Sequence, residues 1–290
     1  YIPEFNEVVN KDNFYLKAQI YAEKGFFPGS IQKKKFLSSV MNQLLMELEK
    51  TPSTQLITML KKSLDEKQLV LHFDNKDLQS FFSQQYWSGE MIVPTCLNKS
   101  SNCVTDYLFP FEANLGVNKA NLYIGKSQAL KVSINESGRV QNYYSISIKN
   151  DSPNEVFPGG TYHNYMQIAL PKNAIVKSLT KNDIQIDNFD TKQGVYTTLG
   201  FLVDIPPHTT STIALHYELP TMLVTGKGTY QLVIQKQIGS PNSDFQFTVV
   251  LPKTVHAMYQ NFSPLVKDGS LNYNTTLTAD KIFFIELLKE

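Results

Sequence analysis

The sequence lacks the residue patterns that mark common enzyme active sites. It has no Gly-x-Ser-x-Gly nucleophile elbow, no glycine loop that would cradle a phosphate, no dinucleotide fingerprint and no histidine pair with zinc-site spacing. The five histidines are scattered over different predicted elements: His72, His163, His208, His216 and His256. We therefore predict no catalytic residue, and the sequence favours a protein that is not an enzyme.

An excess of charge of one sign is also missing. Lys and Arg number 27 and Asp and Glu number 26, which gives a net charge of +1. Because binding to nucleic acid usually requires a surplus of basic residues, we expect no nucleic-acid partner. No apolar run approaches the roughly 20 residues of a membrane-spanning helix, so we expect no membrane span in this chain. The chain begins at Tyr1 instead of Met, and we expect a processed N-terminus with any anchor lying upstream.

Cysteine is scarce, with only Cys96 and Cys103 present. The polar residues 97–102 between them form a loop that can close, and a disulfide there would stabilise the fold by about 2.5 kcal/mol through loop closure. We expect this disulfide, which suits an exported chain; two free thiols are the alternative. A metal site at the cysteines is disfavoured, because no histidine lies near and no second cysteine pair exists.

Apolar and polar residues alternate over the middle of the chain, which is the period of a strand with one buried face. Leu130, Val132 and Ile134 begin this pattern, and it returns in several segments up to Leu219. Prolines end these segments, as expected of residues that cannot donate a ladder hydrogen bond: Pro171, Pro206 and Pro220. The pattern predicts an antiparallel β-sandwich over residues 122–220. His216 alternates outward on its predicted strand and is expected to face solvent.

Part of this pattern recurs further along the chain. Residues 144–149 and the following Ser152-Pro153-Asn154 resemble residues 230–235 and Ser240-Pro241-Asn242. Leu170-Pro171-Lys172 is echoed in the same order by Leu251-Pro252-Lys253. We interpret residues 221–290 as a second, smaller sandwich related to the first, with chance similarity as the alternative.

Residues 1–90 have a mainly helical pattern. Ser30 can cap an amphipathic helix with apolar residues from Phe36 to Leu48, and Thr51-Pro52 can begin another. A strand is expected at 69–73, followed by a short helix capped by Asp74. The predicted fold class is therefore α+β: a helical or mixed region at 1–90, a connector at 91–121, and two tandem antiparallel β-sandwich (Ig-like) domains.

The connector is the preferred place for a bound ligand. It brings carboxylates, an amide and a lysine into a segment with little strand pattern: Asp106, Glu112, Asn114 and Lys119. These residues could bind a polar ligand, and the side-chain oxygen atoms of Asp106, Glu112 and Asn114 would suit calcium, although no cofactor is required. Alternatively, such side chains cap turns at a domain junction.

Two further motifs admit either a ligand or a structural role. Trp87 could be a stacking platform for a sugar, or it could close a core beside Gly89. The segment Gly159-Gly160-Thr161-Tyr162-His163 could approach a ligand closely, or its glycines could serve the turns of a strand connection.

Several strings of the sequence together resemble the C-terminal portion of a known bacterial family, the domain-of-unknown-function family numbered four thousand and twelve. The strings are Tyr86-Trp87-Ser88-Gly89-Glu90, Asp106-Tyr107-Leu108, Asn114-Leu115-Gly116 with Lys119-Ala120-Asn121, Pro158-Gly159-Gly160-Thr161-Tyr162 with Tyr165, residues 200–207, and Gln235-Lys236-Gln237. Members of this family are envelope proteins with an N-terminal membrane anchor and an α/β region distantly similar to the LytR-CpsA-Psr glycopolymer transferases. The resemblance covers nearly the whole chain and implies no catalytic residue in it.

The resemblance implies that this chain is the outer part of a parent anchored in the membrane through a segment N-terminal to Tyr1. We expect a non-catalytic extracytoplasmic module for envelope organisation, adhesion or assembly, with a protein or cell-envelope glycan as partner. The alternatives are part of a glycopolymer-processing enzyme and a carbohydrate-binding module. The very few arginines argue against a transferase site in this chain.

Overall fold

The computed structural model describes residues 1–23, 31–97 and 101–290. The chain divides into two compact units: residues 1–62 with 156–158, and residues 63–155 with 159–290. We describe each unit by itself.

The first unit is helical. It contains η1 (Pro3–Phe5), α1 (Phe14–Glu23), α2 (Ile31–Glu49) and most of α3 (Ser53–Asp65). Phe36 of α2 is fully buried, and its ring lies 5.1 Å from that of Phe5 and 4.4 Å from that of Tyr21. Most other apolar residues of the predicted α2 stripe are half exposed, which leaves this stripe only partly packed: Leu37, Met41, Leu44 and Leu45. The predicted cap at Ser30 lies outside the described residues.

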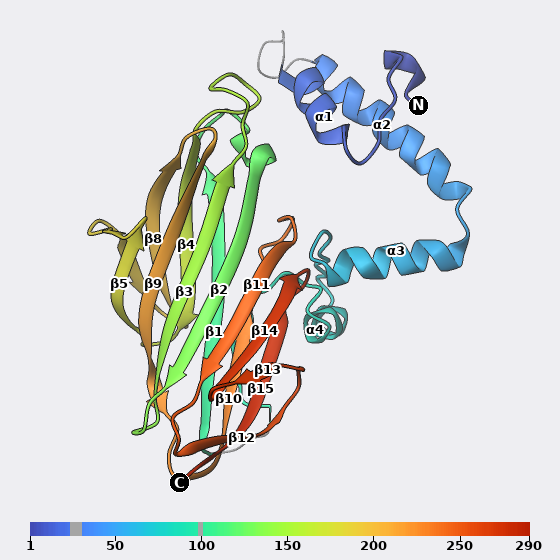
Figure 1. Cartoon of the computed structure of the whole chain (residues 1–290). Coiled ribbons are helices and arrows are strands. Elements are labelled where there is room, and N and C mark those ends of the chain that lie inside the picture. Colours follow the sequence, from blue (N-terminus) through green and yellow to red (C-terminus); the bar gives the residue numbers. More distant parts are fainter. Residues whose placement is uncertain (24–30, 98–100) are drawn as a thin grey trace. The chain divides into compact units, whose positions relative to one another are not determined.

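The second unit is built on two mixed β-sheets packed face to face (Figure 1). One sheet has seven strands in the order β12 (Val255–Gln260), β15 (Lys281–Lys289), β10 (Gly226–Ile234), β1 (Cys103–Asn114), β4 (Tyr162–Pro171), β8 (Tyr196–Ile205) and β7 (Asp190–Gln193). The other has eight strands in the order β13 (Leu265–Lys267), β14 (Ser270–Leu277), β11 (Ser243–Val250), β2 (Ile124–Ile134), β3 (Arg139–Asn150), β9 (Thr209–Met222), β5 (Ile175–Lys181) and β6 (Ile184–Gln185). A short 3-10 helix, η2 (Ala120–Tyr123), leads from β1 into β2.

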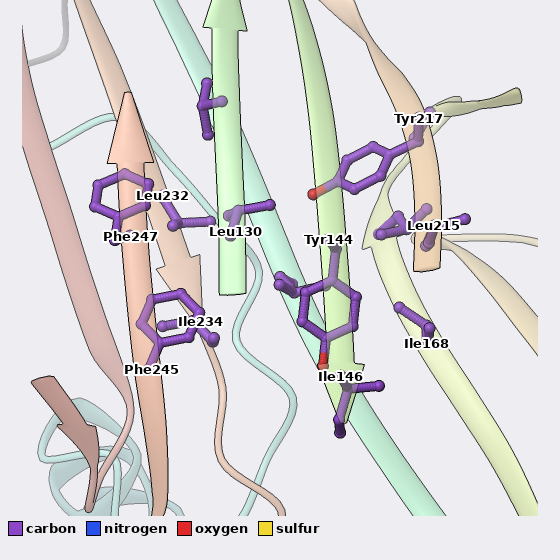
Figure 2. Close-up of a cluster of buried hydrophobic side chains, with 14 of the residues drawn as sticks. Leu130, Tyr144, Ile146, Ile168, Leu215, Tyr217, Leu232, Ile234, Phe245 and Phe247 are labelled. Atoms are coloured by element: carbon purple, nitrogen blue, oxygen red, sulfur yellow. The ribbon is translucent and has the colours of Figure 1, made fainter. Parts of the chain in front are cut away.

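One continuous apolar core lies between the sheets. Leu130 and Tyr144 of the eight-stranded sheet pack in the same cluster as Leu232 of the seven-stranded sheet, and all three are at most 1% exposed. Figure 2 shows Phe245 and Phe247 of β11 beside them. The apolar residues that alternate with polar ones over residues 130–219 are therefore the residues whose side chains face this core.

The predicted fold class is wrong. Residues 221–290 do not form a second sandwich, because β10 pairs in parallel with β1 and β11 pairs in parallel with β2. These two pairings extend both sheets of the first half, so the helical region is followed by one mainly β sandwich with mixed sheets and not by two antiparallel, Ig-like domains. The physical reason is that an alternating pattern specifies which face of a strand is buried but not which strand lies beside it.

Residues 63–97 belong to this second unit, and the last of them, residues 90–97, lie over β1 and β10 on the outward face of the seven-stranded sheet. This segment contains α4 (Lys76–Gln84), whose cap is Asn75 and not the predicted Asp74: the Asn75 carboxamide oxygen accepts from two backbone N–H groups at 3.0 Å. Residues 69–73 are not a strand. The segment is held by Gln231 and Gln235 of the β10 region, each of which bonds a backbone N–H and a backbone carbonyl of residues 90–97.

Candidate functional site

The outward face of the eight-stranded sheet is a polar surface, and five of its strands lie side by side in Figure 1: β14, β11, β2, β3 and β9. Strand alternation places their apolar residues in the core, so the intervening residues face outward. Pairing across the sheet aligns these outward residues in rows. One row contains Asn274, Gln246, Ala129, Ser145, Ala214 and, on β5, Thr180.

The centre of this row has short side chains, and a groove lies over it. Ala129, Ser145 and Ala214 are neighbours on β2, β3 and β9. Two adjoining hollows of about 550 and 490 Å³ share Ala129, Ser145 and Gln246 in their walls. One hollow extends from this row toward Ser147 and Thr276 and the other toward Tyr143 and Thr180, so together they cross the strands obliquely from β14 to β5. We call this feature the sheet groove.

The lining of the sheet groove is rich in hydroxyl and amide groups. Its outward polar residues include Ser127, Ser145, Ser147, Thr212, Gln246, Asn274 and Thr276. Within the described part of the chain, no protein group forms a hydrogen bond with the side chains of Ser145, Gln246 or Asn274. Asp244 and Lys131 supply one charge of each sign, so the lining is close to neutral.

An aromatic pair borders the groove. Tyr143 of β3 lies directly opposite His216 of β9, and their rings stack with centroids 4.2 Å apart and planes 15° apart. Tyr143 is 43% exposed, whereas the Nε2 atom of His216 is buried and has no hydrogen-bond partner. Burial, together with the nearby Lys177 ammonium, lowers the pKa of His216, and Glu218 partly opposes this effect. The imidazole of this pair is therefore neutral at neutral pH.

The sequence-predicted ligand residues do not form one site. Asp106 lies in the core, fully buried, where its carboxylate accepts hydrogen bonds from Tyr230 Oη at 2.7 Å, Asn142 Nδ2 at 2.7 Å and the backbone N–H of Tyr107 at 2.8 Å. Burial raises its pKa to about 6, because these bonds only partly replace the lost solvation. Six residues separate Asp106 from Glu112 on the same strand, which corresponds to about 20 Å at about 3.3 Å per residue.

Glu112 forms a largely buried ion pair with Lys126 of β2, and its second carboxylate oxygen accepts from Asn164 Nδ2 at 3.1 Å. Burial lowers the pKa of Lys126 to about 8. The small cavity beside this pair has a volume of about 30 Å³, enough for a water molecule. This arrangement cross-links the two sheets and leaves no room for a larger ligand.

Asn114 and Lys119 shape the connection after β1. The Asn114 side-chain oxygen accepts from the Gly116 N–H at 2.9 Å, and Lys119 has a left-handed backbone conformation at the start of η2. Both residues thus serve the turn, which is the alternative that the sequence analysis gave for them. Among the described residues, no group of three or more His, Cys, Asp or Glu side chains could hold a metal ion.

Trp87 is part of a packed layer in the second unit. Its indole N–H donates to Asp65 Oδ1 at 2.9 Å, and its ring lies 6.0 Å from that of Phe82. Both contacts are those of a residue that closes a core.

The glycine motif at 159–163 builds a strand connection. Gly159 and Gly160 both have positive φ angles, 142° and 105°, which only glycine adopts readily. The Glu155 carboxylate accepts from the N–H and the hydroxyl of Thr161 at 2.7 and 2.9 Å, and His163 Nδ1 lies 2.8 Å from Asp204 Oδ1 on the surface. The glycines of this motif therefore serve the turns of a strand connection, which was the alternative to ligand binding.

The predicted disulfide between Cys96 and Cys103 is confirmed. It joins the segment that covers the seven-stranded sheet to the first residue of β1, with 6.4 Å between the two Cα atoms. It therefore fixes one end of that segment to the sandwich. No helix among the described residues combines the length and the apolar character that crossing a membrane requires.

Sequence reasoning missed the sheet groove. The signal for it was present in the outward positions of the predicted strands, where Ser145, Ser147 and Ala214 are unusually short. The assembly of these positions into one surface depends on the parallel pairing of β11 with β2, which brings Gln246 beside Ala129. Nothing in the local pattern indicates that pairing.

No protein-family model matches the chain, and no curated protein matches it. Among solved structures, it is similar to a candidate nutrient-binding protein from Legionella pneumophila, with a TM-score of 0.42 and 12% identity over 63% of this chain and 71% of that one. It is also similar to yeast LTA4 hydrolase in complex with bestatin (TM-score 0.37, 10% identity, 57% of this chain, 29% of that one). A further similar structure is an M1 zinc metallopeptidase from Deinococcus radiodurans (TM-score 0.31, 10% identity, 57% of this chain, 42% of that one). The chain thus spans less than half the length of these two enzymes, and at such scores the similarities carry no argument about function.

Proposed function

We propose that this chain is a non-catalytic extracytoplasmic module of a membrane-anchored bacterial surface protein, which binds a protein or glycan of the cell envelope. The observation that carries this proposal is the contrast between the two sheets. Residues 90–97 cover the outward face of the seven-stranded sheet over β1 and β10, whereas within the second unit the outward face of the eight-stranded sheet carries the sheet groove. An open, polar sheet face held by a rigid core is suited to contact with a partner.

The disulfide supports the extracytoplasmic location. Disulfides form and persist in oxidising compartments and are rare where cellular thiols are kept reduced. The Cys96–Cys103 bond lies at the start of β1, where it fixes the covering segment to the sandwich. We propose that the parent is anchored through a segment N-terminal to this chain.

The positions of the acids support a binding role over a catalytic one. Asp106, whose pKa is strongly raised, is enclosed between the sheets, and Glu112 is paired with Lys126. Neither lines the sheet groove. A carboxyl group that cannot reach a substrate cannot serve as a general acid or base for it.

The test uses intact cells of the bacterium that encodes the chain, with an epitope tag on the full-length parent. A protease that cannot enter cells should remove the tagged module, and trapping of thiols under denaturing conditions should find Cys96 and Cys103 oxidised. Protection of the module together with free thiols would overturn the proposal. Turnover of a polyprenyl-phosphate-linked glycan by the purified parent, lost on deletion of this chain, would favour the enzyme alternative instead.

A further inference from the structure

We propose that the sheet groove binds a neutral glycan chain that lies across the strands, with one sugar ring against Tyr143. This inference rests on the proposed function and names the ligand class of the module. It is carried by the shape of the groove, by its uncharged polar lining and by the aromatic pair at its border.

The shape of the groove suits an extended chain. The row from Asn274 on β14 to Ala214 on β9 crosses five neighbouring strands. At about 4.8 Å between strands, this row is about 19 Å long, which is enough for a short oligosaccharide. The three short side chains Ala129, Ser145 and Ala214 let such a chain approach the sheet, and Gln246 and Asn274 continue the same row on β11 and β14 with amide side chains.

The lining chemistry matches sugar hydroxyls. A serine or threonine hydroxyl both donates and accepts hydrogen bonds, and a carboxamide offers a donor and an acceptor side by side. A sugar hydroxyl has the same dual character. Because Ser145, Gln246 and Asn274 have no protein partner within the described chain, their hydrogen-bonding capacity is available to a ligand.

The same lining disfavours other partners. An extended peptide binds a sheet through an unpaired strand edge, but the row residues of β11, β2, β3 and β9 each have a paired strand on both sides. An amphipathic helix requires an apolar floor, and the floor of this groove is alanine and serine. A strongly charged polymer would meet both Lys131 and Asp244, whose opposite charges favour neither sign.

The aromatic pair supplies a stacking surface. His216 stacks on one face of the Tyr143 ring, and Tyr143 as a residue remains 43% exposed. The C–H face of a sugar ring packs on an aromatic ring of this kind, which gains apolar contact while the sugar hydroxyls stay bonded to the groove. Since Tyr143 and His216 hold each other in place, little side-chain freedom is lost on binding.

The experiment titrates the full 290-residue chain with chitohexaose, cellohexaose, maltohexaose and, as a charged comparator, hexagalacturonic acid. We expect saturable calorimetric binding of at least one neutral hexasaccharide and weaker binding of the charged one. Tyr143→Ala should weaken the binding at least tenfold, and Ser145→Leu, which fills the groove, should abolish it. Tyr259→Ala is the matched control, because Tyr259 is an exposed tyrosine of β12 in the other sheet.

Thermal unfolding of each variant separates loss of binding from loss of fold, and Gln246→Ala provides a second groove variant on an exposed side chain. Absence of binding to all three neutral hexasaccharides at millimolar concentration would overturn the glycan inference. So would tighter binding of hexagalacturonic acid, or equal loss of affinity in Tyr259→Ala. A surface-exposed, oxidised module that binds no neutral glycan would leave the proposed function standing and refute only this inference.

Discussion

Tyr143 and His216 occupy directly opposed positions on β3 and β9, and their rings stack at 4.2 Å on the open face of the eight-stranded sheet. The pairing of the two strands holds the rings together, so the stack is part of the fold and does not have to form when a ligand binds. His216 is held neutral by burial and by the nearby Lys177 ammonium. The border of the sheet groove therefore presents an uncharged, preorganised aromatic surface.

The buried carboxyl of Asp106 predicts an unusual pH dependence of stability. Its pKa is about 6 in the folded chain against an ordinary value of 3.8, so between these values the folded state holds a proton that the unfolded state has lost. Stability should therefore be fully gained below about pH 4 and fall as pH rises through about 6, by about 3 kcal/mol in total from this group. Urea unfolding at pH 5.0 and 7.5 should show about half of this change, because pH 5.0 lies only about one unit below the folded pKa.

Asp106→Asn should remove this pH-dependent component, because asparagine does not titrate. Asp244→Asn, on the exposed outward face of β11, is the matched control and should keep it. An Asp106→Asn variant whose stability falls between pH 5.0 and 7.5 as steeply as that of the parent chain would contradict the role given to Asp106.

Removal of the disulfide should destabilise the chain moderately. Replacement of Cys96 and Cys103 by serine frees a loop with a sequence separation of 7, for which loop closure predicts a loss of about 2.5 kcal/mol. The variant's melting temperature should match that of the reduced parent chain and should not respond to a reductant. A reductant that leaves the melting temperature of the parent chain unchanged would contradict the contribution assigned to this bond.

Gln235→Ala should release part of the segment that covers the seven-stranded sheet. The Gln235 side chain is 2% exposed, bonds Ile92 N and Glu90 O at 3.0 and 2.9 Å, and accepts from Tyr107 Oη at 2.6 Å. Loss of these buried hydrogen bonds should lower the free energy of unfolding by about 2 kcal/mol and make residues 90–97 more susceptible to thermolysin. Gln246→Ala, on the exposed face, should change stability by less than about 0.5 kcal/mol. Equal cleavage rates in the two variants would refute the account of the covering segment.

The ion pair between Glu112 and Lys126 should behave as a coupled unit. Lys126→Met alone leaves a largely buried carboxylate without its cation and should cost about 3 kcal/mol. Adding Glu112→Gln removes the uncompensated charge and should restore most of that loss. Additive effects of the two changes in a double-mutant cycle would show that the pair is not coupled.

The sequence predicts the inward faces of the strands because burial on one side produces alternation. Leu130, Val132 and Ile134 are all in the core, as expected. β1 was not predicted, because it is covered on both faces. Tyr107 packs beneath the covering segment, while Leu108 packs in the main core. A strand buried on both faces does not alternate, and this is why Asp106 was placed in a connector.

The local sequence pattern also does not indicate that the strands of residues 221–290 join the sheets formed by the preceding strands. The pairing of β1 with β10 joins residues such as Cys103 and Thr229, which are far apart in the sequence. The repeated strings suggested that residues 221–290 are a related module, but they do not specify that its strands add to the existing sheets. The sheet groove depends on the same long-range pairing, so its residues could be recognised only one strand at a time.

The most direct test of the central claim follows the methyl groups of Ala129 and Ala214, which form the floor of the sheet groove. The full chain, labelled at alanine methyl carbons, is titrated with a pool of neutral hexasaccharides and followed by NMR. The Ala129 and Ala214 signals should shift, with no change at Ala169 and Ala257 in the seven-stranded sheet. Unchanged Ala129 and Ala214 signals at millimolar glycan, or shifts confined to Ala169 and Ala257, would contradict this claim.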